Sequence, residues 1–288
     1  MSRNNPDRTG AHTADADATI PAVQQAQQSA GEAFSFVVPT EFVELPSKGT
    51  VYAENHPLHG QESVEIRHMT TKEEDILTSR ALLKQGVALD RVIQNLMVDK
   101  RIKPDDLIIG DKNAIIVAAR ISGYGSDYGT SITCPACGAT AKYDFNLHDS
   151  KVYDGADAAS LDVTRTENGT FHVELPLTKL NVEFRLLTGA DEKRIVKGME
   201  MERKRKSPEK NVSRQLKTMI ASVNGEGSPA AINELVDNMP SLDARHLRLA
   251  YKLAAPNIDL TQNYECSECG HEQEMEVPLT ADFFWPDR

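Results

Sequence analysis

Long apolar runs, cysteine and tryptophan are all scarce in this chain of 288 residues. No apolar run approaches the roughly 18 residues that cross a bilayer, and no charged start followed by an apolar stretch marks a secretion signal. Four cysteines in a chain of this length are too few for a small secreted scaffold of disulfides. We therefore expect a cytoplasmic protein without a membrane partner.

Signatures of catalysis are missing as well. The sequence contains no HExxH pair, no Walker-type glycine–lysine loop and no GxSxG elbow. The glycines Gly123, Gly125 and Gly129 follow a predicted helix and precede a predicted strand, which is the reverse of the order that points amides at a phosphate. The sequence therefore predicts that the chain is not an enzyme.

Positive charge is in short supply. The chain has 32 Lys and Arg against 43 Asp and Glu, which gives a formal net charge of -11. Because phosphate binding needs a positive field, this balance argues against nucleic acid as a partner. One basic cluster lies between Met199 and Lys210, near the end of a predicted helix, where the helix dipole and a solvated face explain it.

The four cysteines form two matched CxxCG turns, Cys134 with Cys137 and Cys266 with Cys269. Each turn offers two thiolates, and two turns supply the four thiolates of a closed structural zinc site, which leaves no position for water or substrate. The spacing predicts a structural Zn²⁺ held by all four cysteines. A rubredoxin-like iron in the same Cys₄ tetrahedron and a pair of disulfides are the alternatives.

Composition divides the chain into three parts. Residues 1–33 are rich in Ala, Gln, Asp and Thr with almost no large apolar residue, which predicts a disordered arm. Residues 34–150 and 151–288 predict two halves, each with short strands, helices and one cysteine turn between strands. We expect an α+β fold with a helical core, short antiparallel strands and a split Cys₄ zinc ribbon.

Local patterns place several helices. Thr71 with Glu74 predicts a capping box that opens a helix through Leu83, and Asp111 predicts the cap of a later helix. Three further helices are expected in the second half, at about 211–223, 230–239 and 242–253.

The second half repeats part of the first. The segment 182–185 (VEFR) leads into a predicted helix as 64–67 (VEIR) does, at an offset of 118, whereas the cysteine pairs are offset by 132. An insertion of 14 residues in the second half reconciles the two offsets. The pattern predicts an internal duplication with the metal joining the halves across a pseudo-twofold axis, and chance similarity of short segments is the alternative.

The end of the sequence concentrates aromatic residues. The segment 278–286 holds two of the eight phenylalanines and the only tryptophan, as Phe283, Phe284 and Trp285. Buried aromatic residues dominate the energetics of both cores and interfaces. These three residues are therefore candidates either for anchoring on the chain's own core or for binding a partner.

Five segments carry a resemblance to a known family: 42–49 (FVELPSKG), 64–77 (VEIRHMTTKEEDIL), 111–114 (DKNA), 257–261 (NIDLT) and 277–286 (VPLTADFFWP). Over roughly 36–148 and 240–286, the chain resembles baseplate proteins of T-even-type contractile-tailed phages. The resemblance implies a structural or assembly protein of the tail baseplate hub, without enzymatic activity. It also implies that the chain is made in the host bacterial cytoplasm and binds other hub or wedge subunits. It leaves open whether the protein stays in the virion or acts as an assembly chaperone.

A second function from another class is a zinc-ribbon regulator that binds nucleic acid. Such a protein would use the basic helix end and the strands around the cysteines. The acidic net charge argues against it.

Overall fold

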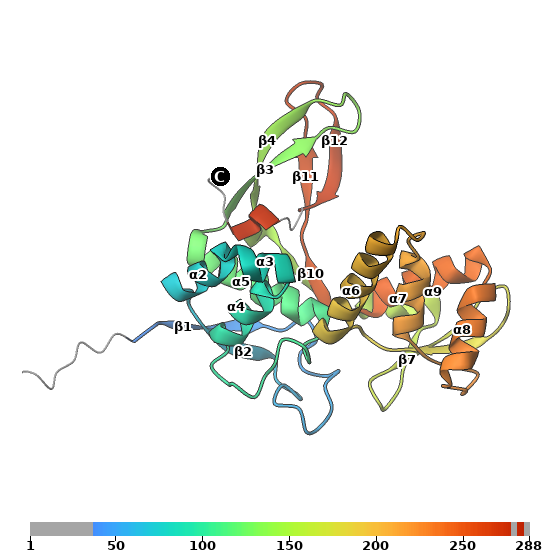
Figure 1. Ribbon diagram of the computed structural model, residues 1–288. Helices are drawn as coiled ribbons and strands as arrows, with labels where there is room; N and C mark the ends of the chain where they lie inside the picture. The colour runs from blue at the N-terminus through green and yellow to red at the C-terminus, as the bar shows by residue number, and fades with distance from the viewer. Residues whose placement is uncertain (1–36, 278–280, 285–288) are drawn as a thin grey trace, which may run out of the picture. The chain divides into compact units, whose positions relative to one another are not determined.

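The computed structural model describes residues 37–277 and 281–284. Contacts between Cα atoms group the chain from Pro39 onward into one compact unit of helices and short antiparallel strands (Figure 1). The expected mixed α and β composition is confirmed in this unit. The arm predicted for residues 1–33, and Trp285, lie outside the described residues.

The first half begins with an antiparallel strand pair followed by helices. Strand β1 (Thr40–Glu44) pairs with β2 (Ser63–Arg67). The helices are α2 (Thr71–Thr78), α3 (Arg80–Gln85), α4 (Ala88–Leu96) and α5 (Ile109–Tyr124). Directly after α4, Met97 forms an antiparallel bridge to Ile66, so the chain returns from the helices to the edge of β2.

Helix α2 has a capping box, but one residue earlier than Thr71 predicted. Thr70 is the N-cap, and its backbone N–H and hydroxyl both donate to the carboxylate of Glu73, at 2.9 and 2.7 Å. The helix also stops short of Leu83, because Ser79 adopts an extended backbone with ψ of 105°. The expected capping register was wrong, since either of two adjacent threonines could be followed by a glutamate at the third position.

The second half contains a four-stranded antiparallel sheet in the order β6-β7-β8-β9. Its strands are β6 (Thr164–Arg165), β7 (Phe171–Glu174), β8 (Asn181–Phe184) and β9 (Ile220–Val223). Its helices are α6 (Gly189–Arg205), α7 (Asn211–Met219), α8 (Pro229–Asn238) and α9 (Ser241–Ala254). The expected helix from 211 to 223 was wrong in its last four residues, which form β9. There, Ile220 and Ser222 are buried while Ala221 and Val223 are partly exposed, which is the period of a strand.

Two β-hairpins and the segments around them connect the halves. The hairpins are β3 (Asp127–Thr133) with β4 (Thr140–Asn146), and β11 (Thr261–Glu265) with β12 (Glu272–Glu276). The remaining elements are the strands β5 (Lys151–Tyr153) and β10 (Asn257–Asp259) and the 3₁₀ turns η2 (Leu147–Asp149), η3 (Ala156–Leu161) and η4 (Ala281–Phe284).

The halves exchange the segments that follow their hairpins. Strand β5 follows the first hairpin and pairs with β10, which leads into the second hairpin. In turn, η4 follows the second hairpin and packs on α5, which leads into the first. The fully buried guanidinium of Arg120 in α5 fixes this contact, because its Nε donates to the carbonyl of Phe283 at 2.7 Å and an Nη donates to that of Asp127 at 2.9 Å. A buried cation needs such partners, so Arg120 holds η4 and the start of β3 against α5.

An aspartate in a helix holds a turn in each half. Asp111 in the first turn of α5 accepts the backbone N–H and the hydroxyl of Ser47 at 3.0 and 2.6 Å. Asp243 in the first turn of α9 accepts the N–H of Leu177 at 2.8 Å and the N–H and hydroxyl of Thr178 at 3.0 and 2.8 Å. Both aspartates are fully buried. The expected role of Asp111 as the cap of its own helix was wrong, because its carboxylate binds the turn after β1.

Two further details recur in the two halves. Lys48 and Lys179, at the end of these turns, both have positive φ angles, of 50° and 58°. Thr188 and Asp191 form a capping box at the start of α6, as happens at the start of α2. The same local solutions therefore occur in the same order in both halves.

Replacing Asp243 by asparagine should lower the free energy of unfolding by about 2 kcal/mol, because buried N–H donors lose a charged acceptor. Burial raises the pKa of Asp243, but the hydrogen bonds from Leu177 and Thr178 lower it by more. The pKa of Asp243 therefore lies below its ordinary value. The carboxylate's stabilisation is therefore fully present above about pH 4 and is lost as pH falls through the lowered pKa. Urea unfolding at pH 7 and in acid should show a difference between variant and wild type that shrinks in acid.

The control for this experiment is Asp237→Asn. The carboxylate of Asp237 is exposed and pairs with Lys217 at 2.8 Å. Such a surface pair contributes about 1 kcal/mol or less. Equal destabilisation by the two variants would contradict a structural role for the buried aspartate.

Candidate metal centre

The two hairpins bring all four cysteines to one point. Cys134 and Cys137 lie in the turn between β3 and β4, and Cys266 and Cys269 lie in the turn between β11 and β12. The four Sγ atoms lie within 4.8 Å of one another. Two of the separations, Cys134 to Cys269 and Cys137 to Cys266, are 3.8 Å. Each close pair therefore joins one cysteine from each half.

The two cysteine turns have the same backbone. The N–H of Gly138 donates to the carbonyl of Cys134 at 2.9 Å, and the N–H of Gly270 donates to that of Cys266 at 2.8 Å. The two glycines have φ of 74° and 68°, in the left-handed region where a residue with a Cβ is strained. This conformation explains why glycine follows the second cysteine of each pair.

The sulfur positions fit a tetrahedral metal. A metal–sulfur distance of about 2.3 Å gives a tetrahedron with edges of about 3.8 Å, which is the separation of both close pairs. A disulfide needs about 2.05 Å, and all four cysteines are free. The cluster can therefore bind a metal ion through four sulfurs, and such a site is closed to substrate.

The surroundings of the sulfurs favour thiolate at one position and oppose a second negative charge. The backbone N–H groups of Glu268 and Cys269 lower the pKa of Cys266 to about 6. The N–H of His271 lowers the pKa of Cys269, but the Cys137 side chain and burial raise it by more, to about 12. Because neighbouring thiolates repel one another, a divalent cation is the group that allows all four to ionise.

Aromatic rings and an amide join the hairpins below the cysteines. The rings of Tyr143 and Tyr264 meet edge to face with centroids 5.1 Å apart, and the Tyr143 hydroxyl donates to the carbonyl of Asn263 at 2.9 Å. The amide of Gln262 donates to the carbonyl of Asn146 at 2.7 Å and accepts its N–H at 3.2 Å. No motif in the sequence marks these residues, and the alternation of Tyr143 with its neighbours is the one local pattern that points to a strand there.

The comparison with known protein families decides what kind of protein carries this centre. The family model described as T4 bacteriophage base plate protein matches residues 39–285. The chain belongs to this family. The match confirms the resemblance and extends it across residues 149–239, where the sequence analysis found none. No curated protein and no solved structure matches the chain.

Two of the three aromatic residues near the end of this base plate protein pack on its own core. Phe283 and Phe284 are only 2% and 3% exposed. The ring of Phe283 lies edge-on to Tyr128 with centroids 5.1 Å apart, and that of Phe284 meets Tyr124 at 6.5 Å. These two phenylalanines therefore pack against the chain's own core. The third candidate, Trp285, lies outside the described residues.

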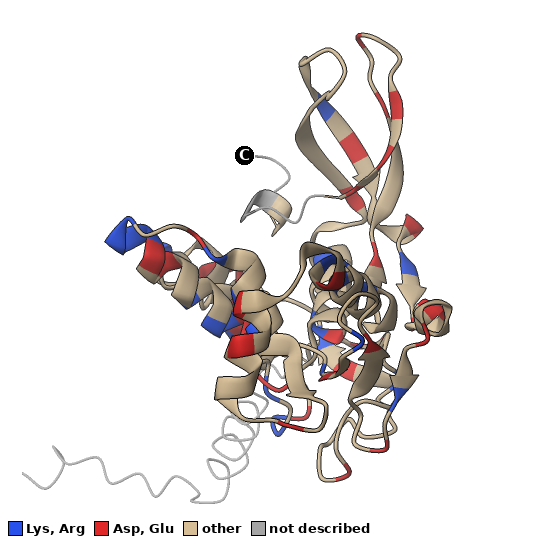
Figure 2. Ribbon diagram, turned by 90° about the vertical axis from the view of Figure 1, so that its right-hand side faces the viewer, with Lys and Arg blue, Asp and Glu red and all other residues tan. Residues whose placement is uncertain are grey.

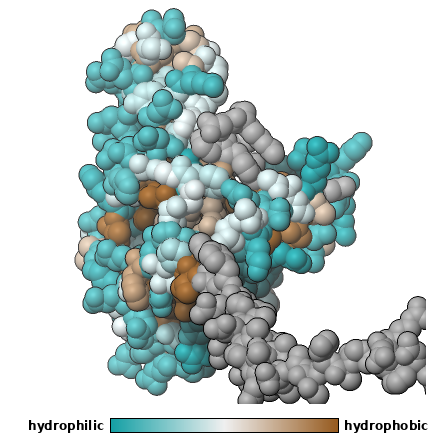
Figure 3. All heavy atoms as spheres, turned by 90° about the vertical axis from the view of Figure 1, so that its left-hand side faces the viewer, coloured by the Kyte–Doolittle hydropathy of each residue, from teal (hydrophilic) through white to brown (hydrophobic). Residues whose placement is uncertain are grey.

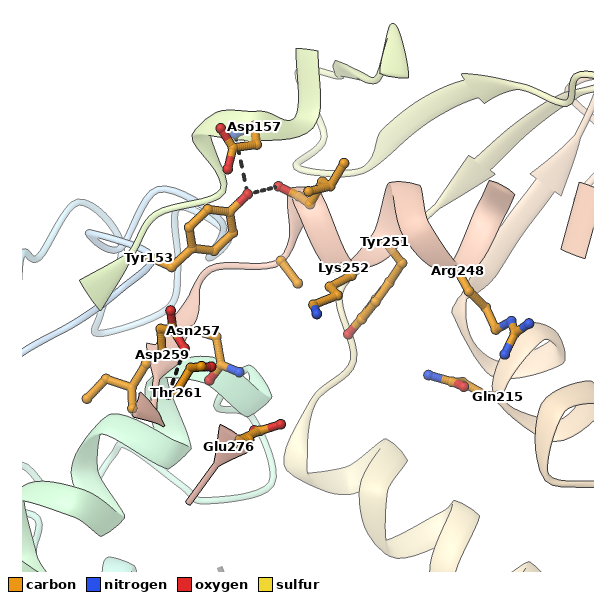
Figure 4. Close-up of a pocket in the computed structure, with 13 residues that line it drawn as sticks. Tyr153, Asp157, Gln215, Arg248, Tyr251, Lys252, Asn257, Asp259, Thr261 and Glu276 are labelled. Atoms are coloured by element: carbon orange, nitrogen blue, oxygen red, sulfur yellow. Dashed lines mark hydrogen bonds between the residues drawn. The ribbon is translucent and has the colours of Figure 1, made fainter. Parts of the chain in front are cut away.

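A concave region of about 570 Å³ lies beside α9 and β10 (Figure 4). Its lining carries both signs of charge, with Arg248 and Lys252 on α9 and Asp259 and Glu276 on the strands. The Tyr153 hydroxyl, at the edge of this region, donates a hydrogen bond to the backbone carbonyl of Leu253 on α9 at 2.7 Å. The lining residues include no cysteine, histidine or serine, so no nucleophile–histidine pair lies there.

Within the described ranges, no helix has the length and apolar character required to cross a membrane.

Replacing Phe283 by alanine should lower the free energy of unfolding by about 3 kcal/mol, because it leaves a cavity against α5 and β3. Phe42→Ala is the matched control, since Phe42 is 73% exposed, and it should change stability by less than about 0.5 kcal/mol. Urea unfolding of both variants measures the difference. If Phe283→Ala were as stable as wild type, the tail would not be an anchor of the fold.

Proposed function

We propose that this chain is a structural or assembly protein of the hub region of a contractile phage tail baseplate. It acts through protein–protein surfaces on hub or wedge subunits and carries one structural Zn²⁺ on Cys134, Cys137, Cys266 and Cys269. The observation that carries the proposal is the four-sulfur cluster in a chain of the base plate family. A closed site stabilises the fold but has no open coordination position for catalysis, as expected of a protein that functions by binding other proteins.

Zinc is the metal that we propose for the centre. Closed Cys₄ sites with a structural role are characteristic of zinc, and the reducing bacterial cytoplasm keeps the thiols available for it. A rubredoxin-like iron would use the same tetrahedron. Iron would colour the purified protein red, so the two metals are easily distinguished.

The proposed zinc would stabilise the paired hairpins more than the helices. The cysteines lie in the turns at the ends of both hairpins, whereas the buried residues Ile115 and Phe184 lie on α5 and β8. Removal of the metal should therefore loosen the hairpins first and, through β10 and η4, weaken the connection between the halves.

We also propose that the two halves, 34–150 and 151–288, arose by duplication. The turns held by Asp111 and Asp243, the capping boxes and the cysteine turns support it, because they follow in the same order in both halves. The offset of 132 between Asp111 and Asp243 equals that between the cysteine turns. The turns at Lys48 and Lys179 are offset by 131 and the capping boxes by 118, so the halves differ in length on both sides of the capping boxes.

The nucleic-acid alternative is weakened by the charge of the hairpins. The strand residues Glu265, Glu272 and Glu274 are exposed on β11 and β12, the strands that a zinc-ribbon regulator would place against its target. Carboxylates at these positions repel phosphate. The assembly function therefore has the stronger support.

Metal content tests the centre. We expect one metal ion per chain by elemental analysis, and a colourless protein if the ion is zinc. Cys137→Ser should lose the ion and lower the midpoint of thermal unfolding by about 5 °C or more, because the serine hydroxyl is a poor zinc ligand. Ser267→Ala, an exposed position between the other two cysteines, should retain the ion. Full metal content in Cys137→Ser would rule out the four-sulfur site.

Association with baseplate subunits tests the function. Native mass spectrometry of the chain mixed with hub and wedge proteins of the same phage should show a defined complex. Finding no complex with any of these proteins would refute the assembly function. Mass spectrometry of mature virions then separates a resident component, which is present, from a chaperone made in the host cytoplasm, which has left.

A further inference from the structure

The second hairpin has an acidic face. Between Thr261 and Glu276 the chain has five glutamates and no lysine or arginine. All five are exposed, and no ion pair involves them within the described part of the chain. Glu265 lies directly opposite Glu272 in the strand register. Like charges at opposed positions destabilise a strand pair, so a positively charged partner at this face would relieve the repulsion.

A compact basic region, the basic tip, lies at 203–210 where α6 ends and α7 is about to begin. It contains five cations, Arg203, Lys204, Arg205, Lys206 and Lys210, against the single carboxylate of Glu209. All are exposed, and within the described ranges none of the five forms an ion pair. Figure 2 shows this concentration of blue at the end of a helix and the red residues on the hairpins.

The helix dipole accounts for only part of the basic tip. Arg203, Lys204 and Arg205 lie in the last turn of α6, where the dipole favours cations by about 0.3–1 kcal/mol each. Lys206 and Lys210 lie beyond that turn. A helix end does not need these additional charges, so they remain available to a partner.

Exposed apolar side chains accompany the basic tip. Val196 and Met201 on α6 and Val212 on α7 are each almost half exposed. The hairpins, at the top of Figure 3, show hydrophilic residues along their length and a mixture of hydrophilic and hydrophobic residues at the tip. The helix pair therefore offers contact area beside its charges, and the hairpin offers the opposite charge.

We propose that the basic tip of one copy of this chain docks on the acidic β11–β12 face of a second copy. Charge complementarity selects this occupant, because both surfaces lie on one polypeptide and neither is neutralised by an ion pair among residues 37–277 and 281–284. The inference rests on the proposed function in one respect: four thiolates with Zn²⁺ carry a net charge of -2, which strengthens the acidic face. The contact joins two different surfaces, so it is head-to-tail and can continue into a ring or a longer assembly.

The proposed contact is made by exposed charges, and this sets its behaviour. At physiological ionic strength such charges are screened over about 8 Å, so association must weaken as salt is added. It must also depend on the sign of charge at both surfaces and at no other exposed cluster.

The test uses reciprocal charge reversal in the full chain. A tip variant carries Arg203→Glu, Lys204→Glu and Arg205→Glu, and a face variant carries Glu272→Lys, Glu274→Lys and Glu276→Lys. Sedimentation velocity should show that the wild type self-associates at low salt and dissociates at about 0.5 M salt. Each variant alone should associate at least tenfold more weakly. An equimolar mixture of the two should regain association, because the reversed tip of one meets the reversed face of the other.

A control variant reverses three exposed cations elsewhere, Lys72→Glu, Arg80→Glu and Arg91→Glu. It has the same net charge as the tip variant and should associate like wild type. Metal content and unfolding midpoint establish that every variant is folded. A wild type that stays monomeric at low salt, or a mixture that fails to regain association, would overturn the proposal. So would a tip variant that loses RNA or DNA binding while it self-associates normally.

The outcome is separable from that of the proposed function. A wild type that holds one zinc and binds baseplate subunits but stays monomeric refutes only the self-association. A wild type that self-associates by this contact but binds no baseplate subunit refutes only the assembly function.

Discussion

The four sulfurs at the ends of two hairpins set the main constraint on this structure. Each half of the chain can supply two ligands, so neither can close a tetrahedral site alone. The close pairs, Cys134 with Cys269 and Cys137 with Cys266, each join the two halves. Bringing together turns that are 132 residues apart costs chain entropy, which grows only slowly with separation. The ordered segments next to the hairpins offset this entropy before any metal binds.

Those segments are exchanged between the halves. Strand β5 pairs with β10, and η4 packs on α5 through Arg120 and the two phenylalanines. Buried polar groups also connect segments that are far apart in the sequence. The carboxylates of Asp111 and Asp243 each accept hydrogen bonds from a distant turn. A wrong register would leave such groups without partners at a cost of about 1–3 kcal/mol each. The hydrogen bonds therefore select one arrangement of segments that apolar packing alone would permit in several.

The exterior of the described part of the chain carries separate regions of opposite charge. The four sulfurs lie close to one another, and Phe283 and Phe284 are packed in the core. Charge remains as the most distinctive feature of the exterior, with glutamates on the second hairpin and cations at the end of α6. The chain belongs to the base plate family. Opposite charges on separate elements fix the orientation in which two proteins bind.

The sequence by itself determined the features that depend on neighbouring residues. The two CxxCG turns, the strands on either side and the mixed α and β composition could be predicted, because turn chemistry and alternation act over a few residues. The resemblance to baseplate proteins was also readable from short strings. Only the tertiary structure decided between equal local alternatives. It chose Thr70 over Thr71 as the cap, and it made 220–223 a strand because β8 offered an open edge. It also placed Phe283 against Tyr128 and buried Arg120 against the carbonyl of Phe283. Both contacts join residues more than 150 positions apart, which no local sequence pattern specifies.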